Sequence, residues 1–404
     1  MAINFIDQLF GFLGYVFLEG SANNRKVEIS IQKDANELCC SRCHSKNIKR
    51  RGTKTRKFRT VPIGKKAVFV VLILQRIECL DCGCVRQEEI NFAEPKKRYT
   101  QVFERYALEL SKYMTILDVA RHLGISWDMV KDIQKRYLTK RFSKPQLKNL
   151  RLIAIDEISI GSHHKYLTVV MDLLSGAVIF VGDGKGADSL LPFWPQLKES
   201  KAKIEAIAID MSPAYIEAVS THLPETAIVF DHFHVIKLFN DKLSKLRREL
   251  YREATDSLDK EVLKGTMWLL LKNPENLNEE KNEQKRLQEA LRLNEPLATA
   301  YYMREDLRQL WSQDDKSKAE IFLQDWIARA RCSGIRMLNK FANTLAAHRS
   351  GILAYYDYPI STGPLEGTNN KIKTMQRQAY GFRDMEFFKL KILALHETKY
   401  ALVG

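Results

Sequence analysis

The 404-residue sequence lacks both a long apolar run and a high cysteine content. Its seven cysteines are too few for a disulfide scaffold in a chain of this length. Residues 1–20 are apolar, but they include Asp7 and lack both a basic start and a small-residue cleavage pattern, so we do not expect a signal peptide. That stretch is shorter than a convincing membrane span. We therefore expect a cytoplasmic protein in which residues 1–37 form a docking segment, with an amphipathic element that packs on something else.

Acidic residues are also in the minority. The chain has 49 Asp and Glu against 64 Lys and Arg, which gives a formal net charge of +15. Such an excess points to an anionic partner, either nucleic acid or a membrane surface. A hydrophobic content of 45% is that of a globular protein, and 404 residues are too many for one core, so two to four structural units are expected.

Six of the seven cysteines lie close together, between Cys39 and Cys84. They include two Cys-x-x-Cys pairs separated by a stretch with the pattern of a β-hairpin. Two such pairs can direct four thiolates at one ion, which predicts a zinc-ribbon-like domain over residues 38–92 with one structural Zn²⁺. Cys39 or Cys84 could replace a neighbour, and reduced cysteines without metal remain the alternative. The predicted ligands are Cys40, Cys43, Cys79 and Cys82.

Residues 46–59 contain eight basic side chains and no acidic one. A run of this kind is usually a solvated loop. Beside a zinc module, its density favours contacts to DNA phosphates, which we expect from Arg50, Arg51 and Lys54.

Residues 98–145 have the pattern of a helix-turn-helix. Apolar spacing predicts one helix before Gly124 and a second helix after Ser126, which is placed to cap it. An ordinary helical hairpin is the alternative. In a helix-turn-helix the second helix enters the major groove of double-stranded DNA. The residues expected at that surface are Ser126, Trp127, Lys131, Gln134 and Lys135.

From residue 147 the pattern predicts three consecutive strands, then alternating helices and strands, and then a long helical region at about 240–355. Asp156 is expected to close the first strand and Asp210 the fourth. In a sheet of order 3-2-1-4-5 these strands are parallel neighbours, so both carboxylates emerge at one edge. Glu366, on a later helix, could join them. Converging carboxylates repel one another unless divalent cations bind, and oxygen ligands suit Mg²⁺ or Mn²⁺.

Other polar residues lie close to these positions in the sequence. Asp231 ends the fifth strand and is expected to cap the helix that follows. We predict that Asp231 and His234 lie beside the carboxylates, and direct contact of one of them with the site is the alternative. Glu157 should point to the opposite face of its strand from Asp156, which makes it the weaker catalytic candidate.

Four stretches, "AIDEISI…HKYLTVVMDLLSG", "AIDMSPAYIEAV", "IVFDHFHVIKLFN" and "GPLEGTNNKIKTMQRQAYGFR", resemble the DDE transposases of the bacterial ISL-three insertion-sequence family. The likeness covers nearly the whole chain. It implies a ribonuclease-H-like catalytic domain over residues 147–404 with a helical insertion, and a magnesium-binding triad at Asp156, Asp210 and Glu366. It also implies binding of element ends and target DNA, strand cleavage and transfer, and a homodimer when two ends are paired, with the protein on the nucleoid when bound. The alternatives are a transcriptional regulator, or a nuclease that cuts DNA without joining it.

Overall fold

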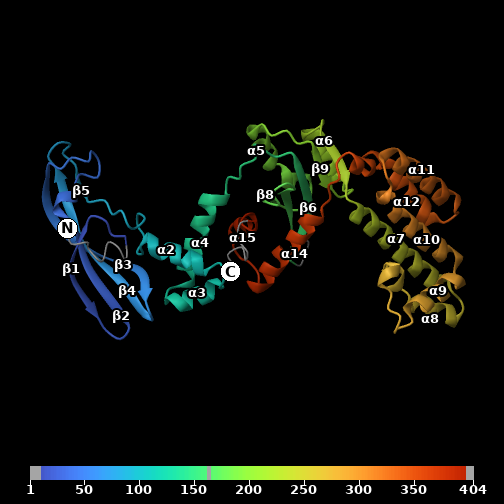
Figure 1. The fold of residues 1–404 in the computed structure, drawn as a ribbon, viewed down its shortest axis with the longest axis horizontal. Coiled ribbons are helices and arrows are strands. Elements are labelled where there is room, and N and C mark those ends of the chain that lie inside the picture. Colours follow the sequence, from blue (N-terminus) through green and yellow to red (C-terminus); the bar gives the residue numbers. More distant parts are fainter. Residues whose placement is uncertain (1–10, 162–164, 397–404) are drawn as a thin grey trace. The chain divides into compact units, whose positions relative to one another are not determined.

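The computed structural model describes residues 11–161 and 165–396. The chain divides into two compact units, one of residues 1–144 with 374–404, the other of residues 145–373 (Figure 1). In the described part of the chain, no helix is long and apolar enough to cross a membrane.

The first unit begins with a five-stranded sheet in the order β1-β2-β4-β3, with β5 paired to β4. The long β3–β4 hairpin turns at Gly64, whose φ of 57° is readily adopted by glycine. Val68, Val70 and Leu72 alternate along β4 and are buried together with Phe58. The described part of the predicted docking segment thus supplies two strands to this sheet, while residues 1–10 lie outside the described residues. The elements are β1 (Tyr15–Ala22), β2 (Lys26–Lys33), η1 (Ala35–Glu37), β3 (Ile48–Ile63), β4 (Lys66–Cys79) and β5 (Val85–Gln87).

Three helices follow in this unit, and the last two form the helix-turn-helix that the sequence predicts. Gly124, with a φ of 62°, ends α3, and the Ser126 hydroxyl accepts the Met129 N–H at 3.2 Å to cap α4. A C-terminal helix, α15, packs against α4 and adds Phe387 to the same core. The helices are α2 (Gln101–Leu110), α3 (Ile116–Leu123), α4 (Trp127–Phe142) and α15 (Met385–Leu393).

The second unit is built on a mixed sheet of order β10-β9-β6-β7-β8. If the five strands are numbered in chain order and the sheet is read from β8 to β10, the order is 3-2-1-4-5, which confirms the predicted arrangement. The strand β6 pairs antiparallel with β7 and parallel with β9, and β9 pairs parallel with β10. The strands are β6 (Leu152–Gly161), β7 (Lys165–Asp172), β8 (Val178–Asp183), β9 (Ala206–Ile209) and β10 (Ala227–Phe230). Between them lie η2 (Ala187–Leu190), α5 (Phe193–Ser200) and α6 (Pro213–His222).

Asp156 does not close its strand, in contrast to the prediction. β6 continues to Gly161, and Asp156 lies opposite Val169 of β7. The prediction failed because the β6–β7 hairpin extends beyond the parallel pairing. The pairing of β6 with β9 ends at Ala154, two residues earlier, so Asp156 still lies just past the edge that the two parallel strands share.

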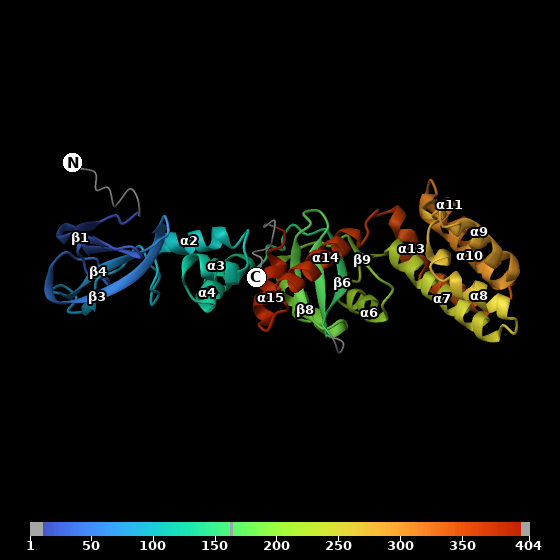
Figure 2. The ribbon, with the colours of Figure 1, turned by 90° about the horizontal axis from the view of Figure 1, so that it is seen from below.

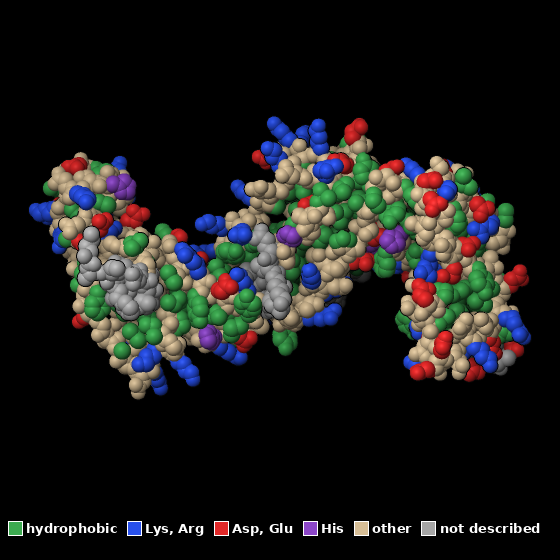
Figure 3. Space-filling model, viewed as in Figure 1, with side chains coloured by type: hydrophobic (Ala, Val, Ile, Leu, Met, Phe, Trp, Pro, Cys, Tyr) green, Lys and Arg blue, Asp and Glu red, His purple; other side chains and the backbone are tan. Residues whose placement is uncertain are grey.

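After β10 the chain is helical, and Figure 2 shows α7 leading from the sheet into the helical insertion. On the face shown in Figure 3, acidic and basic side chains are interspersed over the insertion. The insertion contains α8 (Ser257–Gly265), η3 (Leu269–Leu271), η4 (Pro274–Asn276), α9 (Glu283–Leu293), α10 (Glu295–Arg308), η5 (Gln309–Ser312), α11 (Lys316–Cys332), α12 (Arg336–Ala347), α13 (Arg349–Leu353) and η6 (Ala354–Tyr356). It follows α7 (His232–Glu253) and precedes α14 (Gly363–Gln378), a helix that begins in the second unit and ends in the first.

Candidate functional site

The four cysteines predicted to bind zinc gather at one point of the first unit. The Sγ atoms of Cys40, Cys43, Cys79 and Cys82 all lie within 4.8 Å of one another. The Sγ–Sγ distance is 3.5 Å between Cys43 and Cys79 and 3.7 Å between Cys40 and Cys82, close to the edge of a ZnS₄ tetrahedron with Zn–S bonds of about 2.3 Å. The backbone N–H groups of Cys43 and Arg42 lower the pKa of Cys40 to about 6, which favours the thiolate that a metal requires. The site therefore fits a structural Zn²⁺.

A fifth thiol lies against this cluster. Cys84 Sγ is 3.3 Å from both Cys40 and Cys82. The sequence left Cys84 open as a replacement for Cys82, and the distances keep both residues at the site. Cys40, Cys43, Cys79 and Cys82 are nevertheless the set whose members are all mutually close.

The second helix of the helix-turn-helix presents less free surface than the sequence suggests. Lys131 Nζ lies 3.0 Å from Asp384 Oδ2, and Lys135 Nζ lies 3.1 Å from both Asp384 Oδ2 and Glu386 Oε2. Burial alone would raise the pKa of Asp384, but the Phe387 N–H and the two lysines lower it to about 2. Two expected base-contacting cations are therefore paired with the residues that begin α15.

Gln134 lies inside the first unit, which does not agree with its expected contact to DNA bases. Its side chain is fully buried, and its amide has no hydrogen-bond partner in the described part of the chain. Gln134 lies one turn from Val130 and Leu138, and therefore on the buried face of α4. Trp127 is 44% exposed at the start of α4, and Ser126 is occupied in capping the helix.

The three basic residues expected to contact phosphates lie on β3. Arg50, Arg51 and Lys54 are exposed in the outer part of the β3–β4 hairpin, so the basic run is a strand rather than a loop. Arg51 Nε donates to Glu78 Oε2 at 2.6 Å. The exposed pair constrains Arg51 only weakly.

In the second unit the structure brings Asp156, Glu157 and Asp210 close enough to influence one another. Burial, with contributions from the charges of Glu157 and Asp210, raises the pKa of Asp156 to about 6. Burial and the charge of Asp210 also raise the pKa of Glu157. Asp210 follows β9, and its Oδ1 accepts the Ser212 N–H at 3.0 Å. Glu157 was expected to point to the opposite face of its strand from Asp156, but it is close enough to Asp210 for that charge to raise its pKa.

Helix α14 packs against this site. Asn369 Nδ2 donates to Asp156 Oδ2 at 2.8 Å, and the other oxygen of Asp156 accepts the Glu157 N–H at 2.8 Å. Glu366 lies in the first turn of α14, three residues before Asn369 and on the same side of the helix. The three predicted catalytic carboxylates do not form a set as close as Cys40, Cys43, Cys79 and Cys82, whose Sγ atoms all lie within 4.8 Å of one another.

Asp231 connects the starts of two helices. It caps α7 by accepting the Phe233 N–H at 3.1 Å, as the sequence predicts. Its Oδ2 accepts hydrogen bonds from both the backbone and the hydroxyl of Thr362, directly before α14. The Thr362 carbonyl in turn accepts the Glu366 N–H at 2.9 Å. Asp231 therefore fixes the turn of α14 that carries Glu366.

His234 lies one turn into α7. Its ring exerts an electrostatic influence that lowers the pKa of Asp156, so it faces the acidic residues. The Nε2 atom is buried and has no hydrogen-bond partner within the described residues. Sequence reasoning did not identify Asn369 or Thr362 as part of the site. Their polar side chains at and near the start of an acidic helix were the available signal.

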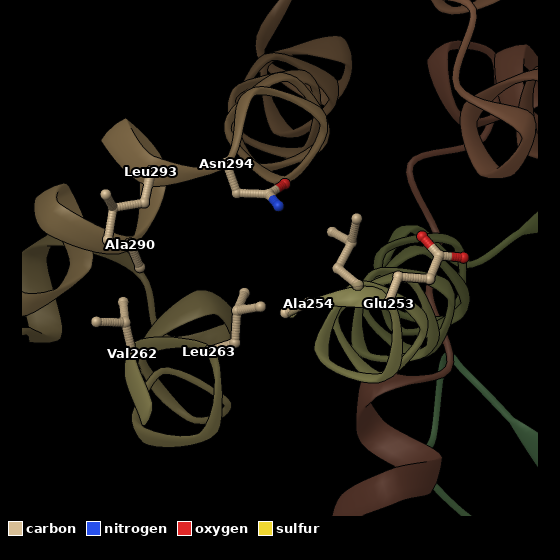
Figure 4. Close-up of a pocket in the computed structure, with 8 residues that line it drawn as sticks. Glu253, Ala254, Val262, Leu263, Ala290, Leu293 and Asn294 are labelled. Atoms are coloured by element: carbon tan, nitrogen blue, oxygen red, sulfur yellow. The ribbon is translucent and has the colours of Figure 1, made fainter. Parts of the chain in front are cut away.

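A separate cavity of about 210 Å³ lies in the helical insertion, between the ends of α7, α8 and α9 (Figure 4). Its lining is mostly apolar, and Glu253 and Asn294 are its polar side chains. None of the acidic residues around Asp156 borders it. This cavity is therefore not the candidate site.

Comparison with known families covers all three regions of the chain. Residues 153–392 match the ISL3-type DDE family described as "Transposase". Residues 88–138 match the "Helix-turn-helix domain of transposase family ISL3", and residues 37–82 match the "zinc-finger of transposase IS204/IS1001/IS1096/IS1165".

Two relatives match over most of their length. The chain is 32% identical over 373 residues to the transposase for insertion sequence element IS1001 of Bordetella parapertussis, covering 92% of this chain and 91% of that protein. It is 28% identical over 393 residues to the transposase for insertion sequence element IS1557 of Mycobacterium tuberculosis, covering 90% of this chain and 87% of that protein. Among solved structures, the Drosophila P element transposase strand transfer complex aligns with a TM-score of 0.39 and 10% identity, covering 74% of this chain and 92% of that one.

The resemblance found in the sequence motifs is therefore confirmed, as are the zinc ribbon, the helix-turn-helix and the ribonuclease-H-like sheet with its helical insertion. The chain belongs to the ISL3 family of insertion-sequence transposases, and it is a DDE transposase whose helix-turn-helix binds DNA.

Proposed function

We propose that Asp156, Asp210 and Glu366 form the catalytic triad that cleaves the ends of the element and joins them to target DNA. The observation that carries this proposal is the hydrogen bond from Asn369 to Asp156, because it fastens the helix that bears Glu366 to the strand that bears Asp156. Asp210 follows the neighbouring parallel strand, and its charge contributes to the raised pKa of Asp156. Glu157 lies beside the triad, and we assign it no role in the reaction.

The donor set fits a divalent cation. Burial and the neighbouring carboxylates raise the pKa of Asp156 to about 6, so negative charge is crowded there. A divalent ion removes that repulsion, and carboxylate oxygens favour Mg²⁺ or Mn²⁺. Asp156, Asp210 and Glu366 would hold it. When bound, ions of this kind activate the attacking oxygen and stabilise the leaving oxygen in transfer of a phosphodiester.

The chain's own residues position this chemistry. Asn369 orients the Asp156 carboxylate through Oδ2. Asp231 and Thr362 fix the first turn of α14 and hence the backbone of Glu366. His234 offers a buried ring nitrogen without a partner among the described residues, which suits a hydrogen bond to a ligand or to the DNA. These residues are positioning groups rather than the reacting ones.

The first unit is proposed to select the DNA. The exposed cations Arg50, Arg51 and Lys54 suit phosphate contacts, which carry no sequence information. Trp127, the exposed first residue of α4, suits contacts to bases. Pairing of two element ends calls for two copies of the chain, so we propose a homodimer in the complex with DNA. We also propose that the protein is on the nucleoid when bound.

The test is the Asp156→Asn variant, assayed with DNA carrying the element's ends, a target plasmid and Mg²⁺. Asparagine keeps an oxygen that can accept from Asn369 but lacks the negative charge, so cleavage should fall by at least about two to three orders of magnitude. Binding of end DNA should remain within a few-fold of the unaltered protein. Retained cleavage would refute the catalytic assignment. Cut ends that are never joined would instead indicate a nuclease without strand transfer.

A further inference from the structure

Tyr380 adopts a backbone conformation that its residue type disfavours. It follows α14 with a φ of 52°, in the left-handed region. The Gly381 N–H bonds to the Gln376 carbonyl at 2.9 Å and the Tyr380 N–H to Arg377 at 3.1 Å, so Tyr380 occupies the left-handed position of a helix end where glycine is usual. A tyrosine there is strained, because its Cβ comes too close to the following carbonyl oxygen.

The ring of Tyr380 does not compensate for this strain by packing. The residue is 99% exposed, the most exposed of the large apolar side chains in the described chain. Strained backbone and a large exposed ring are both unfavourable for the free protein, and glycine would avoid both. Strained residues of this kind cluster at functional sites and ligand clamps.

A cavity of about 490 Å³ adjoins Tyr380 within the first unit. It lies between α4 and the segment from residue 379 to residue 387, and its volume is typical of small-ligand sites. Three aromatic side chains, Trp127, Phe382 and Phe387, border it together with the charged Lys131, Arg383 and Asp384.

The charges around this cavity favour an anionic occupant with a flat ring. Two cations, Lys131 and Arg383, face one carboxylate, Asp384, which is already paired with Lys131 and Lys135. Lys131 Nζ also lies 5.4 Å from the centre of the Trp127 ring. Aromatic rings beside basic side chains are the chemistry that binds single-stranded nucleic acid, by stacking on the base and neutralising its phosphate.

The cavity is also at the correct place on the helix-turn-helix. Trp127 is the first residue of α4 and Lys131 lies one turn later. The beginning of the second helix is the part of such a motif that reaches DNA bases. A nucleotide displaced from the duplex at this point would be within reach of the cavity.

We propose that this cavity receives an unpaired nucleotide of the bound DNA, with Tyr380 stacking on its base and Lys131 and Arg383 contacting its phosphate. The proposal rests on the DNA binding of the helix-turn-helix, but not on the catalytic triad. It makes Tyr380 a residue that recognises distorted or opened DNA.

The experiment compares two short duplexes that differ only in one additional, unpaired 2-aminopurine, which forms a bulge in the second duplex. It uses the full-length zinc-loaded protein without divalent catalytic ion. The protein should quench the fluorescence of the unpaired 2-aminopurine. It should also bind the bulged duplex roughly five- to a hundredfold more tightly than the paired one, the range expected for one stacked base.

Two variants isolate the ring of Tyr380. Tyr380→Phe keeps a stacking surface and should behave like the unaltered protein. Tyr380→Gly relieves the backbone strain, so it should fold at least as well and bind paired DNA equally, but lose both the quenching and the preference for the bulge. Arg383→Gln should weaken binding of the bulged duplex alone.

Equal affinity of the unaltered protein for both duplexes would overturn the proposal. Quenching that persists in Tyr380→Gly would also overturn it. A Tyr380→Gly protein that keeps the bulge preference but loses concentration-dependent self-association would overturn it as well, because the cavity would then receive a second copy of the chain. Asp156 belongs to the second unit and Tyr380 to the first. The result for strand transfer in Asp156→Asn therefore does not affect these binding measurements, and either proposal can be refuted while the other stands.

Discussion

Asn369 Nδ2 donates a hydrogen bond to Asp156 Oδ2 at 2.8 Å, between a helix and a strand that are 213 residues apart in the sequence. Asn369 is buried, and its own Oδ1 has no partner in the described part of the chain. The bond uses one lone pair of one carboxylate oxygen, so other lone pairs of Asp156 remain available to bind a metal ion. It also holds against this strand the helix that carries Glu366 one turn earlier.

We predict that Asn369→Ala lowers cleavage about 10- to 100-fold, as expected when a partner that orients a metal ligand is removed. The loss should be partly recovered at high Mg²⁺ concentration, because the defect lies in the placement of a ligand. Cleavage rates over a Mg²⁺ titration measure this, with end binding as the control.

Asn369→Asp is the matched variant. It has nearly the same shape but adds negative charge beside Asp156, whose pKa is already raised by its neighbours. It should therefore be more damaging than Asn369→Ala at pH 7, and less so if Mn²⁺ replaces Mg²⁺, since Mn²⁺ binds such sites more tightly. An Asn369→Asp protein as active as the unaltered one would argue against a role for this contact.

The order of the second unit's sheet could be predicted because it follows from short-range patterns. Three strands with tight connections usually form a meander, and strands that alternate with helices usually run parallel. The same reasoning placed Asp156 and Asp210 near one edge. It could not show that β6 continues past Asp156, because that depends on how far β7 remains paired with it.

The burial of Gln134 and the position of α15 could not be predicted, for a different reason. The pattern of α4 is weakly amphipathic, and Gln134 is polar on a face that is apolar at Val130 and Leu138. Which helix covers that face is a matter of tertiary packing. The segment that supplies part of the cover, α15, is 250 residues away in the sequence. Local periodicity carries no information about that partner.

The zinc site gives a prediction that separates two neighbouring thiols. Cys82→Ser should lose the metal, and the purified protein should otherwise contain about one zinc per chain, as a closed four-ligand site requires. Cys84→Ser should keep the zinc, since Cys84 contacts Cys40 and Cys82 but is not one of the four cysteines that form the mutually close set. Metal analysis by mass spectrometry of both variants measures this, and the reverse pattern would make Cys84 the ligand.

Asp384 gives a prediction about DNA affinity. It holds Lys131 at 3.0 Å and Lys135 at 3.1 Å, so both cations are partly neutralised before DNA binds. Asp384→Asn removes the charge but keeps a residue that can cap α15, where Asp384 accepts the Phe387 N–H at 3.0 Å. Affinity for DNA of any sequence should increase, and the salt dependence should steepen by up to roughly 0.9 for each lysine that gains a phosphate contact.

The control for Asp384→Asn is Glu386→Gln. The Glu386 side chain is 85% exposed and pairs with Lys135, so its effect on affinity and salt slope should be small. Fluorescence anisotropy of labelled duplexes at several salt concentrations measures both. An Asp384→Asn protein with unchanged affinity and slope would mean that DNA does not approach these lysines.

Lys391 gives a prediction about pH and stability. Its Nζ is fully buried in α15 with no hydrogen-bond partner in the described chain, 5.3 Å from the centre of the Phe387 ring and 5.7 Å from that of Phe382. Burial lowers the pKa of this amine to about 7. In the unfolded chain the amine has a pKa of about 10.4, so between about pH 7 and pH 10 the unfolded state binds more protons. The contribution of Lys391 to stability must then rise with pH across that window and stay constant below it.

Lys391→Met replaces the amine by an apolar side chain of similar length. It should be more stable than the unaltered protein at pH 7 by at least about 1 kcal/mol, since one unit of pKa corresponds to about 1.4 kcal/mol. The advantage should shrink steadily towards pH 10, where the unfolded amine also loses its proton. Thermal unfolding of both proteins between pH 6.5 and pH 10 measures the difference. Comparing the two proteins cancels the titration of the cysteines, the tyrosines and the lysines at positions 131 and 135. A difference that stays constant over this range would show that Lys391 remains charged and solvated in the folded protein, and that α15 does not bury it against the helix-turn-helix.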